Sequence, residues 1–259
     1  MPFSADAIGV QSWCFREFKE RKQLIAQVTG CGLSRVELCG VHADFANEAT
    51  FDATIAELRA GGISIDSIGV QHFSGDEAKE RKYFEFAKRA GAKTISADFK
   101  PDFALAGFRS AEKFAKEYGI RVAIHNHGGR HWLGNAQMLD AVFANTSDSI
   151  GLCLDTAWAM DAGEDPVALV TRYAKRLYGL HIKDFAFDRA RRPDDVVAGT
   201  GNLDCAKLVA ALRAADFSGY SVIEYEADVK DPGPAIAKCV AAVKAATNAN
   251  AKQEKSHAR

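Results

Sequence analysis

The sequence predicts a single-domain α/β barrel of eight βα units, the (β/α)₈ or TIM-barrel arrangement. Short apolar runs alternate with amphipathic stretches along the whole chain, and no Pro/Ser-rich linker separates them. Eight such units fit within 259 residues, which is a usual size for this barrel. No GxGxxG turn follows the first apolar run, so an open doubly wound sheet is disfavoured.

The expected strands are the eight apolar runs, at residues 7–13, 34–40, 63–70, 92–98, 120–127, 149–155, 177–184 and 220–226. Amphipathic helices are expected between them, for example over residues 76–91 and 205–217, each closing near a glycine or a pair of small and acidic residues. The barrel is expected over residues 1–247. Residues 248–259 are polar and lack periodicity, which predicts a disordered tail.

Composition and charge exclude several classes of protein. The 33 basic and 34 acidic residues nearly cancel, so neither nucleic acid nor an anionic membrane is an expected partner. The six cysteines form no CxxC pair and are expected to be reduced. The N-terminus lacks the pattern of a signal peptide, and no apolar run is long enough to span a membrane. A cytoplasmic location is therefore expected.

Polar residues end the later strands on one face. Alternate residues of a barrel strand point inward, and the carboxyl ends of the strands form the active-site mouth. Three consecutive strands place a small residue inward and, two positions later, a ligand-type residue: His125, Asp155 and His181. The eighth strand places Glu224 inward with Val222, a looser match.

These four side chains would meet at one centre. Two imidazoles and two carboxylates form a nitrogen and oxygen donor set that suits one divalent ion. Mn²⁺ is the first choice, followed by Co²⁺, Fe²⁺ and Zn²⁺, and an all-oxygen set would suit Mg²⁺ better. An ion with six ligands would keep two positions for substrate oxygens.

The segments "GLCLDTAW", "LHIKD" and "VIEYE" resemble strands of the xylose isomerase-like barrel family. This is the sugar phosphate isomerase/epimerase group, which includes ketose 3-epimerases, inosose dehydratases, hydroxypyruvate isomerases and, more distantly, endonuclease IV-type enzymes. The resemblance covers almost the whole chain. It implies that Asp155, His181 and Glu224 are metal ligands.

Two positions depart from the family pattern. His125, in "HNH", stands where the epimerases carry a glutamate that is both ligand and acid/base, so a symmetric proton shuttle between two carboxylates is in doubt. Either His125 or His127 could be the fourth ligand. Trp158 stands where many relatives have a substrate-binding histidine. The "IHNHG" and "IEYE" strands look like the branch that acts on 3-keto sugars and 3-keto glycosides.

The resemblance implies an isomerase or epimerase that acts on a keto sugar or its derivative through a metal-stabilised enediolate. Glu224 is the expected base, because it matches the family's catalytic glutamate. His127 is the expected acid on the opposite face. The same enediolate would also support β-elimination, as in a 3-keto-glycoside lyase or an inosose dehydratase. The sequence does not choose between epimerisation, isomerisation and elimination.

Further residues near the predicted mouth are expected to support this chemistry. Lys183 would orient a substrate oxyanion as a third catalytic residue, and Asp184 would hold the His181 ring. Phe15 and Trp132 are candidates for stacking on a sugar, while His42 and His72 are assigned structural roles. The segment "GTGNLD" is read as a helix start capped by Asn202 or Asp204. The expected substrate-binding residues are Gln11, Trp13, Glu37, Trp158 and Glu226.

Two other functions stay open. A nuclease of the endonuclease IV type would need more histidine ligands and a basic surface. The sequence offers neither, which disfavours this function. A non-catalytic sugar-binding barrel or partner subunit would bind its ligand without exchanging substrate hydrogen. The expected partners are thus a small sugar and possible further subunits, in a homo-oligomer or with a different chain.

Overall fold

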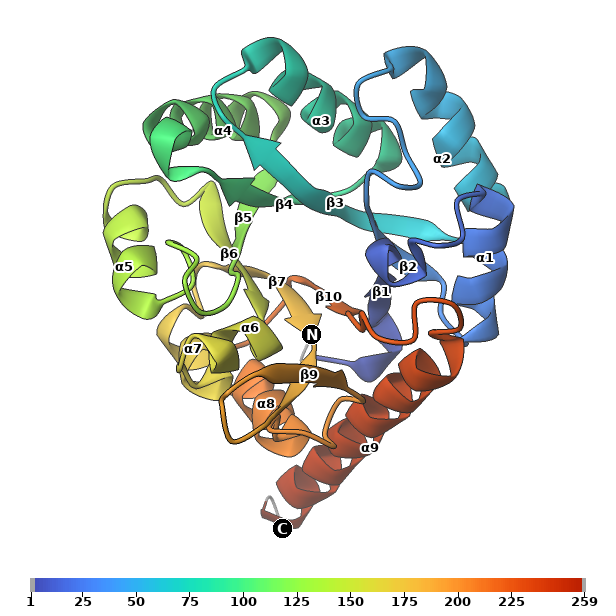
Figure 1. Cartoon of the computed structure of the whole chain (residues 1–259), viewed down its shortest axis with the longest axis vertical. Coiled ribbons are helices and arrows are strands. Elements are labelled where there is room, and N and C mark those ends of the chain that lie inside the picture. Colours follow the sequence, from blue (N-terminus) through green and yellow to red (C-terminus); the bar gives the residue numbers. More distant parts are fainter. Residues whose placement is uncertain (1–2, 258–259) are drawn as a thin grey trace.

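A closed parallel barrel forms the centre of the molecule, as the sequence predicts (Figure 1). The computed structural model describes residues 3–257. The strands follow the order β1-β10-β7-β6-β5-β4-β3-β2 around the ring. They are β1 (Gly9–Gln11), β2 (Arg35–Leu38), β3 (Ser64–Phe73), β4 (Thr94–Phe99), β5 (Arg121–His125), β6 (Ile150–Asp155), β7 (Leu177–Ile182) and β10 (Tyr220–Ile223).

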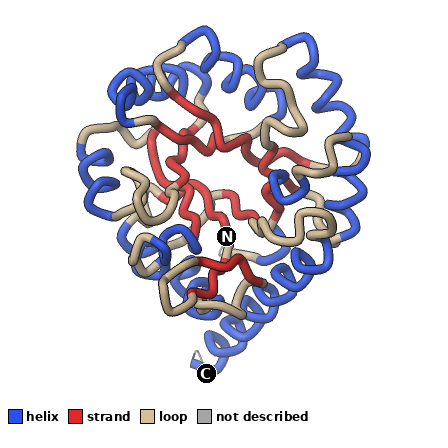
Figure 2. Tube along the Cα trace, viewed as in Figure 1, coloured by secondary structure: helices blue, strands red, loops and turns tan. Residues whose placement is uncertain are grey.

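Helices surround this ring (Figure 2). The α-helices are α1 (Arg21–Gly30), α2 (Phe51–Ala60), α3 (Glu77–Ala90), α4 (Ala104–Tyr118), α5 (Ala136–Ala144), α6 (Thr156–Asp161), α7 (Pro166–Arg172), α8 (Cys205–Ala214) and α9 (Gly233–His257). Short 3₁₀ helices are η1 (Ala5–Ala7), η2 (Ser12–Phe15), η3 (Glu48–Thr50) and η4 (Pro101–Phe103). The fold is a (β/α)₈ TIM barrel.

Two apolar clusters hold the barrel together. The larger lies between the strands and the helices and includes the outward residues Val122, Ile124, Leu152 and Leu154, none of which is exposed. The smaller fills the lumen. Its members are Ala123, Cys153, Tyr178, Tyr220 and Val222. The barrel is therefore a packed core, and the candidate site lies at its mouth.

Inward glycines make room for two tyrosine rings in the lumen. A Cβ on Gly179 would lie 2.5 Å from the Tyr220 ring, and one on Gly151 would lie 2.3 Å from the ring of Tyr178. Tyr178 was expected to face outward, and this prediction is wrong. The pairing of β6 with β7 shifts at this point, from Leu152 opposite Leu177 to Cys153 opposite Gly179. This irregularity breaks the strict alternation of side chains.

Two segments differ from the expected elements. A hairpin of β8 (Asp184–Phe187) and β9 (Pro193–Val196) follows β7, where no strand pair was expected. Helix α9 continues through the segment expected to be a disordered tail, as far as His257, and residues 258–259 lie outside the described residues. Alanine, lysine, glutamine and glutamate are common there and favour a helix. The domain boundary at residue 247 stays a prediction.

All six cysteines are buried and free. This agrees with the expectation that they are reduced. Among residues 3–257, no helix combines the length and the apolar character needed to cross a membrane.

Candidate metal centre

Four buried side chains meet at the carboxyl ends of neighbouring strands. His125 ends β5, Asp155 ends β6, His181 is the penultimate residue of β7, and Glu224 follows β10 directly. One ligand atom from each of the four residues lies within 4.8 Å of the others. The structure thus brings together all four of the expected metal ligands.

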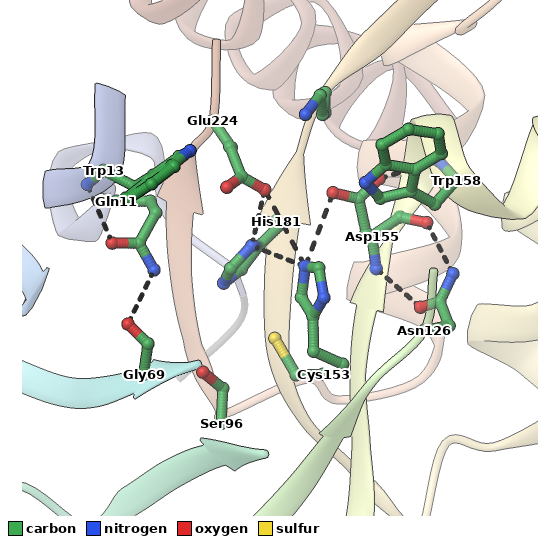
Figure 3. Close-up of polar contacts among 12 residues, drawn as sticks. Gln11, Trp13, Gly69, Ser96, Asn126, Cys153, Asp155, Trp158, His181 and Glu224 are labelled. Carbon is green, nitrogen blue, oxygen red and sulfur yellow. Dashed lines mark hydrogen bonds and ion pairs between the residues drawn. The ribbon is translucent and has the colours of Figure 1, made fainter. Parts of the chain in front are cut away.

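The atoms of this cluster converge on a small volume (Figure 3). Nε2 of His125 lies 3.1 Å from Nδ1 of His181, 3.6 Å from Oδ2 of Asp155 and 3.7 Å from Oε2 of Glu224. Nδ1 of His181 lies 2.9 Å from Oε2 of Glu224. Donor atoms from four residues that face one another in this way match the needs of one divalent cation.

Glu37 holds the His181 ring from the other side. Its Oε1 lies 3.1 Å from Nε2 of His181 and also accepts hydrogen bonds from Gln11 Nε2 at 2.5 Å and Ser96 Oγ at 2.8 Å. A carboxylate that accepts from one ring nitrogen leaves the other as a lone-pair donor, so Nδ1 would be the ligating atom of His181. Glu37 was expected to bind the substrate. Instead it is completely buried beneath the cluster and does not line the cavity described below.

The prediction that Asp184 holds His181 is wrong. Its two carboxylate oxygens accept hydrogen bonds from the backbone N–H groups of residues 199, 201, 202 and 203. These amides form a concave anion-binding site, and the Asp184 carboxylate occupies it. Asp204 is the N-cap of α8, one of the two caps expected for "GTGNLD".

Asp155 is positioned by contacts with Trp158 in α6 and with Asn126, which follows β5. Its Oδ1 caps α6 by accepting a hydrogen bond from Trp158 N at 2.8 Å, and the Asn126 side chain bonds its backbone N–H and C=O. Among the residues that the structure describes, none forms a hydrogen bond with its Oδ2, and burial raises the pKa of this carboxyl group. A cation beside Oδ2 would offset that burial, so the residues fit a divalent metal ion.

Charge around Glu224 keeps its carboxylate ionised. Burial alone would raise the pKa of Glu224, but Lys183, His181 and His125 together lower it well below the usual range. Lys183 is itself buried, donates to Glu226 Oε1 and lies 3.6 Å from Asp195 Oδ2 in β9. The unpredicted hairpin therefore helps to hold the lysine beside the cluster. Glu224 has the protonation state of a general base.

A cavity of about 500 Å³ opens next to the four ligands. Of the expected substrate-binding residues, Gln11, Trp13, Trp158 and Glu226 line it together with His125, His127 and Glu224. Trp13 is 40 % exposed and donates from Nε1 to Glu226 Oε2 at 3.0 Å. Phe15 and Trp132 do not line this cavity. Two tryptophans and several polar groups form a wall that suits a sugar-sized ligand.

His127 lines the same cavity as a neutral imidazole. Burial, with His125 and His131 nearby, lowers its pKa to about 3. The expectation of an imidazole that titrates near neutral pH is therefore not met in the protein without ligands. Neutral His127 can still accept a proton or donate one from its N–H group.

Sequence analysis missed three polar residues near the centre. Asn126 stands between the two predicted histidines, Asp98 lies near the end of β4, and His131 belongs to the loop after β5. Asp98 shares the inward parity of Ser96, so the alternation rule could have found it. His131 lies in a loop without periodicity, and the sequence carries no signal for its position.

The fold and the cluster define a class of protein: a (β/α)₈ barrel with a His₂-carboxylate₂ centre at the carboxyl ends of its strands. The family model "Xylose isomerase-like TIM barrel" matches residues 25–246. The chain belongs to this family, which confirms the resemblance seen in the sequence.

Named relatives share parts of this chain. It is 31% identical to the rhizopine catabolism protein MocC of Rhizobium meliloti over 48% of this chain and 42% of that protein. It is 24% identical to the inosose dehydratase of Geobacillus kaustophilus over 71% of this chain and 65% of that enzyme. The chain thus spans about half to two thirds of the length of these relatives.

Among solved structures, the 3-keto-D-glucoside 4-epimerase of E. coli has a similar fold. The TM-score is 0.69 at 16% identity, and the match covers 92% of this chain and 99% of that one. At 16% identity, this similarity supports a conclusion about the fold and nothing further.

Proposed function

We propose that this protein is a divalent-metal-dependent enzyme that removes the proton next to the carbonyl group of a keto sugar or keto polyol. The observation that carries the proposal is the buried His125, Asp155, His181 and Glu224 cluster beside the cavity of about 500 Å³. A bound divalent ion would polarise the substrate carbonyl as a Lewis acid and so acidify the neighbouring C–H bond. The nitrogen and oxygen donor set favours Mn²⁺ as this ion.

Glu224 is the proposed base. It is ionised, it lines the cavity, and only one of its carboxylate oxygens, Oε2, lies against His125 and His181. Its second oxygen is therefore free to take the α proton. Lys183 stabilises this ionised form by its positive charge. Because its Nζ is bonded to Glu226, we assign Lys183 an electrostatic role instead of direct contact with the substrate.

His127 is the proposed proton donor on the other side of the cavity. A neutral imidazole is a weak acid, but its N–H group can protonate a departing hydroxyl as the C–O bond breaks. Trp13 and Trp158 would pack against the ring of the substrate, and Gln11 and Glu226 would bond its hydroxyl groups. These residues lie where they can fix which carbon faces Glu224.

Elimination of water is the outcome that we favour. The two sides of the cavity are unequal, with an ionised carboxylate and a neutral imidazole, whereas reversible epimerisation is served best by two similar acid/base groups. In elimination the α C–H bond breaks and its proton goes to Glu224, the C–O bond at the β carbon breaks, and a C=C bond forms. The departing hydroxide takes the N–H proton of His127 and leaves as water, and the proton on Glu224 then returns to His127, which restores both groups. The similarity to inosose dehydratase supports this choice.

Epimerisation is the second candidate. His127 lines the cavity with Glu224, and in this reaction it would return a proton to the opposite face of the carbon and so invert it. A homo-oligomer and a partner subunit stay predictions.

The test is to incubate the Mn²⁺-loaded protein in D₂O with inososes, ketoses and 3-keto glucosides. Loss of the α-hydrogen NMR signal with loss of one water, seen by mass spectrometry, is the result expected for elimination. Deuterium incorporation with inversion and no loss of mass would instead establish epimerisation. Binding of a sugar without any exchange would contradict the enzyme proposal and favour a sugar-binding barrel.

A further inference from the structure

A second group of ligand-type side chains lies beside the first centre. Asp98 comes from β4, His127 from just beyond β5, and His131 from the loop that follows. One ligand atom from each lies within 4.8 Å of the others. Nε2 of His131 is 3.1 Å from Oδ1 of Asp98, and the ring centroids of His127 and His131 are 5.1 Å apart.

This group is distinct from the four-residue centre. It shares no member with His125, Asp155, His181 and Glu224. The ring centroids of His125 and His127 are 4.6 Å apart, so the two groups are neighbours along one side of the mouth. An ion at each would have its own set of ligands.

One polar atom of the group lacks a partner. Nδ1 of His127 is buried without a hydrogen bond among the described residues. A buried polar atom that bonds neither water nor protein destabilises a fold. A cation in this position would take up the lone pair of His127.

His72 extends the group towards solvent. Its Nδ1 lies 3.2 Å from Oδ2 of Asp98, and its side chain is 63% exposed. His72 and His127 both line the cavity of about 500 Å³. The remaining coordination positions of an ion here would therefore face the cavity, where water or a ligand oxygen could fill them.

We propose that Asp98, His127 and His131, with His72 at the edge, form a second divalent cation site. Imidazole and carboxylate ligands in this ratio suit Zn²⁺ or Co²⁺ and disfavour Mg²⁺ and Ca²⁺, which prefer oxygen ligands. The protein would then hold two ions that face one cavity. The proposal does not depend on which reaction the first centre performs.

The test counts ions per chain. The protein is stripped with a chelator, dialysed against Co²⁺ and measured by elemental analysis and by visible absorption of the bound Co²⁺. Wild type is expected to bind two ions per chain. His131→Ala is expected to bind one ion at the four-residue centre, Asp155→Asn one ion at the new site, and the double variant none. The control His42→Gln changes a histidine outside both groups and is expected to keep two.

Wild type that saturates at one ion per chain would overturn the proposal, because Asp98 and His131 would then be a plain ion pair. Retention of both ions by the His131→Ala variant would also overturn the proposal. Circular dichroism of each variant checks the fold, and the wild-type count stands without any variant. Failure of sugar turnover would contradict the proposed function but would leave this ion count unchanged, so the two proposals fail separately.

Discussion

Nε2 of His181 lies 3.1 Å from Oε1 of Glu37, a carboxylate with no exposed surface that comes from a strand 144 residues earlier in the chain. This contact fixes which ring nitrogen of His181 faces the metal centre. It also joins β2 to β7 across the barrel, so that the orientation of a ligand depends on barrel closure.

Replacing this carboxylate should weaken metal binding. We expect Glu37→Gln to lower Mn²⁺ affinity by about 10-fold to 100-fold, the usual effect of losing a partner that orients a histidine ligand. Isothermal titration calorimetry measures the affinity. Glu80→Gln is the matched control, since Glu80 is also completely buried but accepts hydrogen bonds from the backbone N–H groups of Ser74 and Gly75, just before α3. Equal losses in both variants would show a general effect of removing a buried charge.

Glu224→Gln should stop proton removal. The amide cannot act as a base, so we expect α-hydrogen exchange to fall by about 100-fold to 10,000-fold. Exchange into D₂O, followed by NMR at saturating Mn²⁺, measures the rate. Full turnover in this variant would move the role of base to Glu226, the other glutamate that lines the cavity.

Gly179→Ala should destabilise the barrel. The new Cβ would lie 2.5 Å from the Tyr220 ring, and that ring is held by a hydrogen bond to Cys153. Overpacking of this kind costs about 1–3 kcal/mol in unfolding free energy. Urea unfolding measures it. Gly30→Ala at the end of α1 is the control, because a Cβ there meets nothing within 4 Å. Equal stability of the two variants would contradict the packing argument.

Acid should destabilise the protein partly through His42. Its Nε2 lies 3.0 Å from the Phe18 carbonyl oxygen, and burial lowers the pKa of this imidazole below its usual value. Below about pH 6.5 the unfolded chain binds a proton that the fold excludes, so this contribution to stability is complete above that pH and is lost as the pH falls.

Urea unfolding from about pH 7.5 to about pH 5.5 tests this for wild type and His42→Gln. We expect the unfolding free energy of the variant to decline less, since glutamine does not titrate and keeps an N–H group for the Phe18 carbonyl. Identical declines would show that His42 makes no contribution.

Much of the barrel could be predicted from local pattern. Each of the eight expected apolar runs overlaps an observed strand, although β3 and β4 extend to Phe73 and Phe99, beyond the expected ends at residues 70 and 98. Strands buried on both faces are nearly continuous apolar segments, which makes them visible in the sequence. The hairpin of β8 and β9 could not be predicted in this way, since each strand has only 4 residues and β9 contains a proline and two aspartates. The Tyr178 side chain points inward because the pairing of β7 with β6 shifts at this point. The residues of β7 alone give no sign of this shift.

Alternation along a strand is a local property of the backbone, so the amino-acid sequence was enough to assign His125, Asp155, His181 and Glu224 to the inner face, although it failed for Tyr178. The partner that each side chain contacts depends on the folded barrel. Glu37 and not Asp184 holds His181, and Asp98 stands beside His131. The distance between side chains from different strands depends on strand tilt, register and barrel closure, none of which is encoded in a single stretch of sequence.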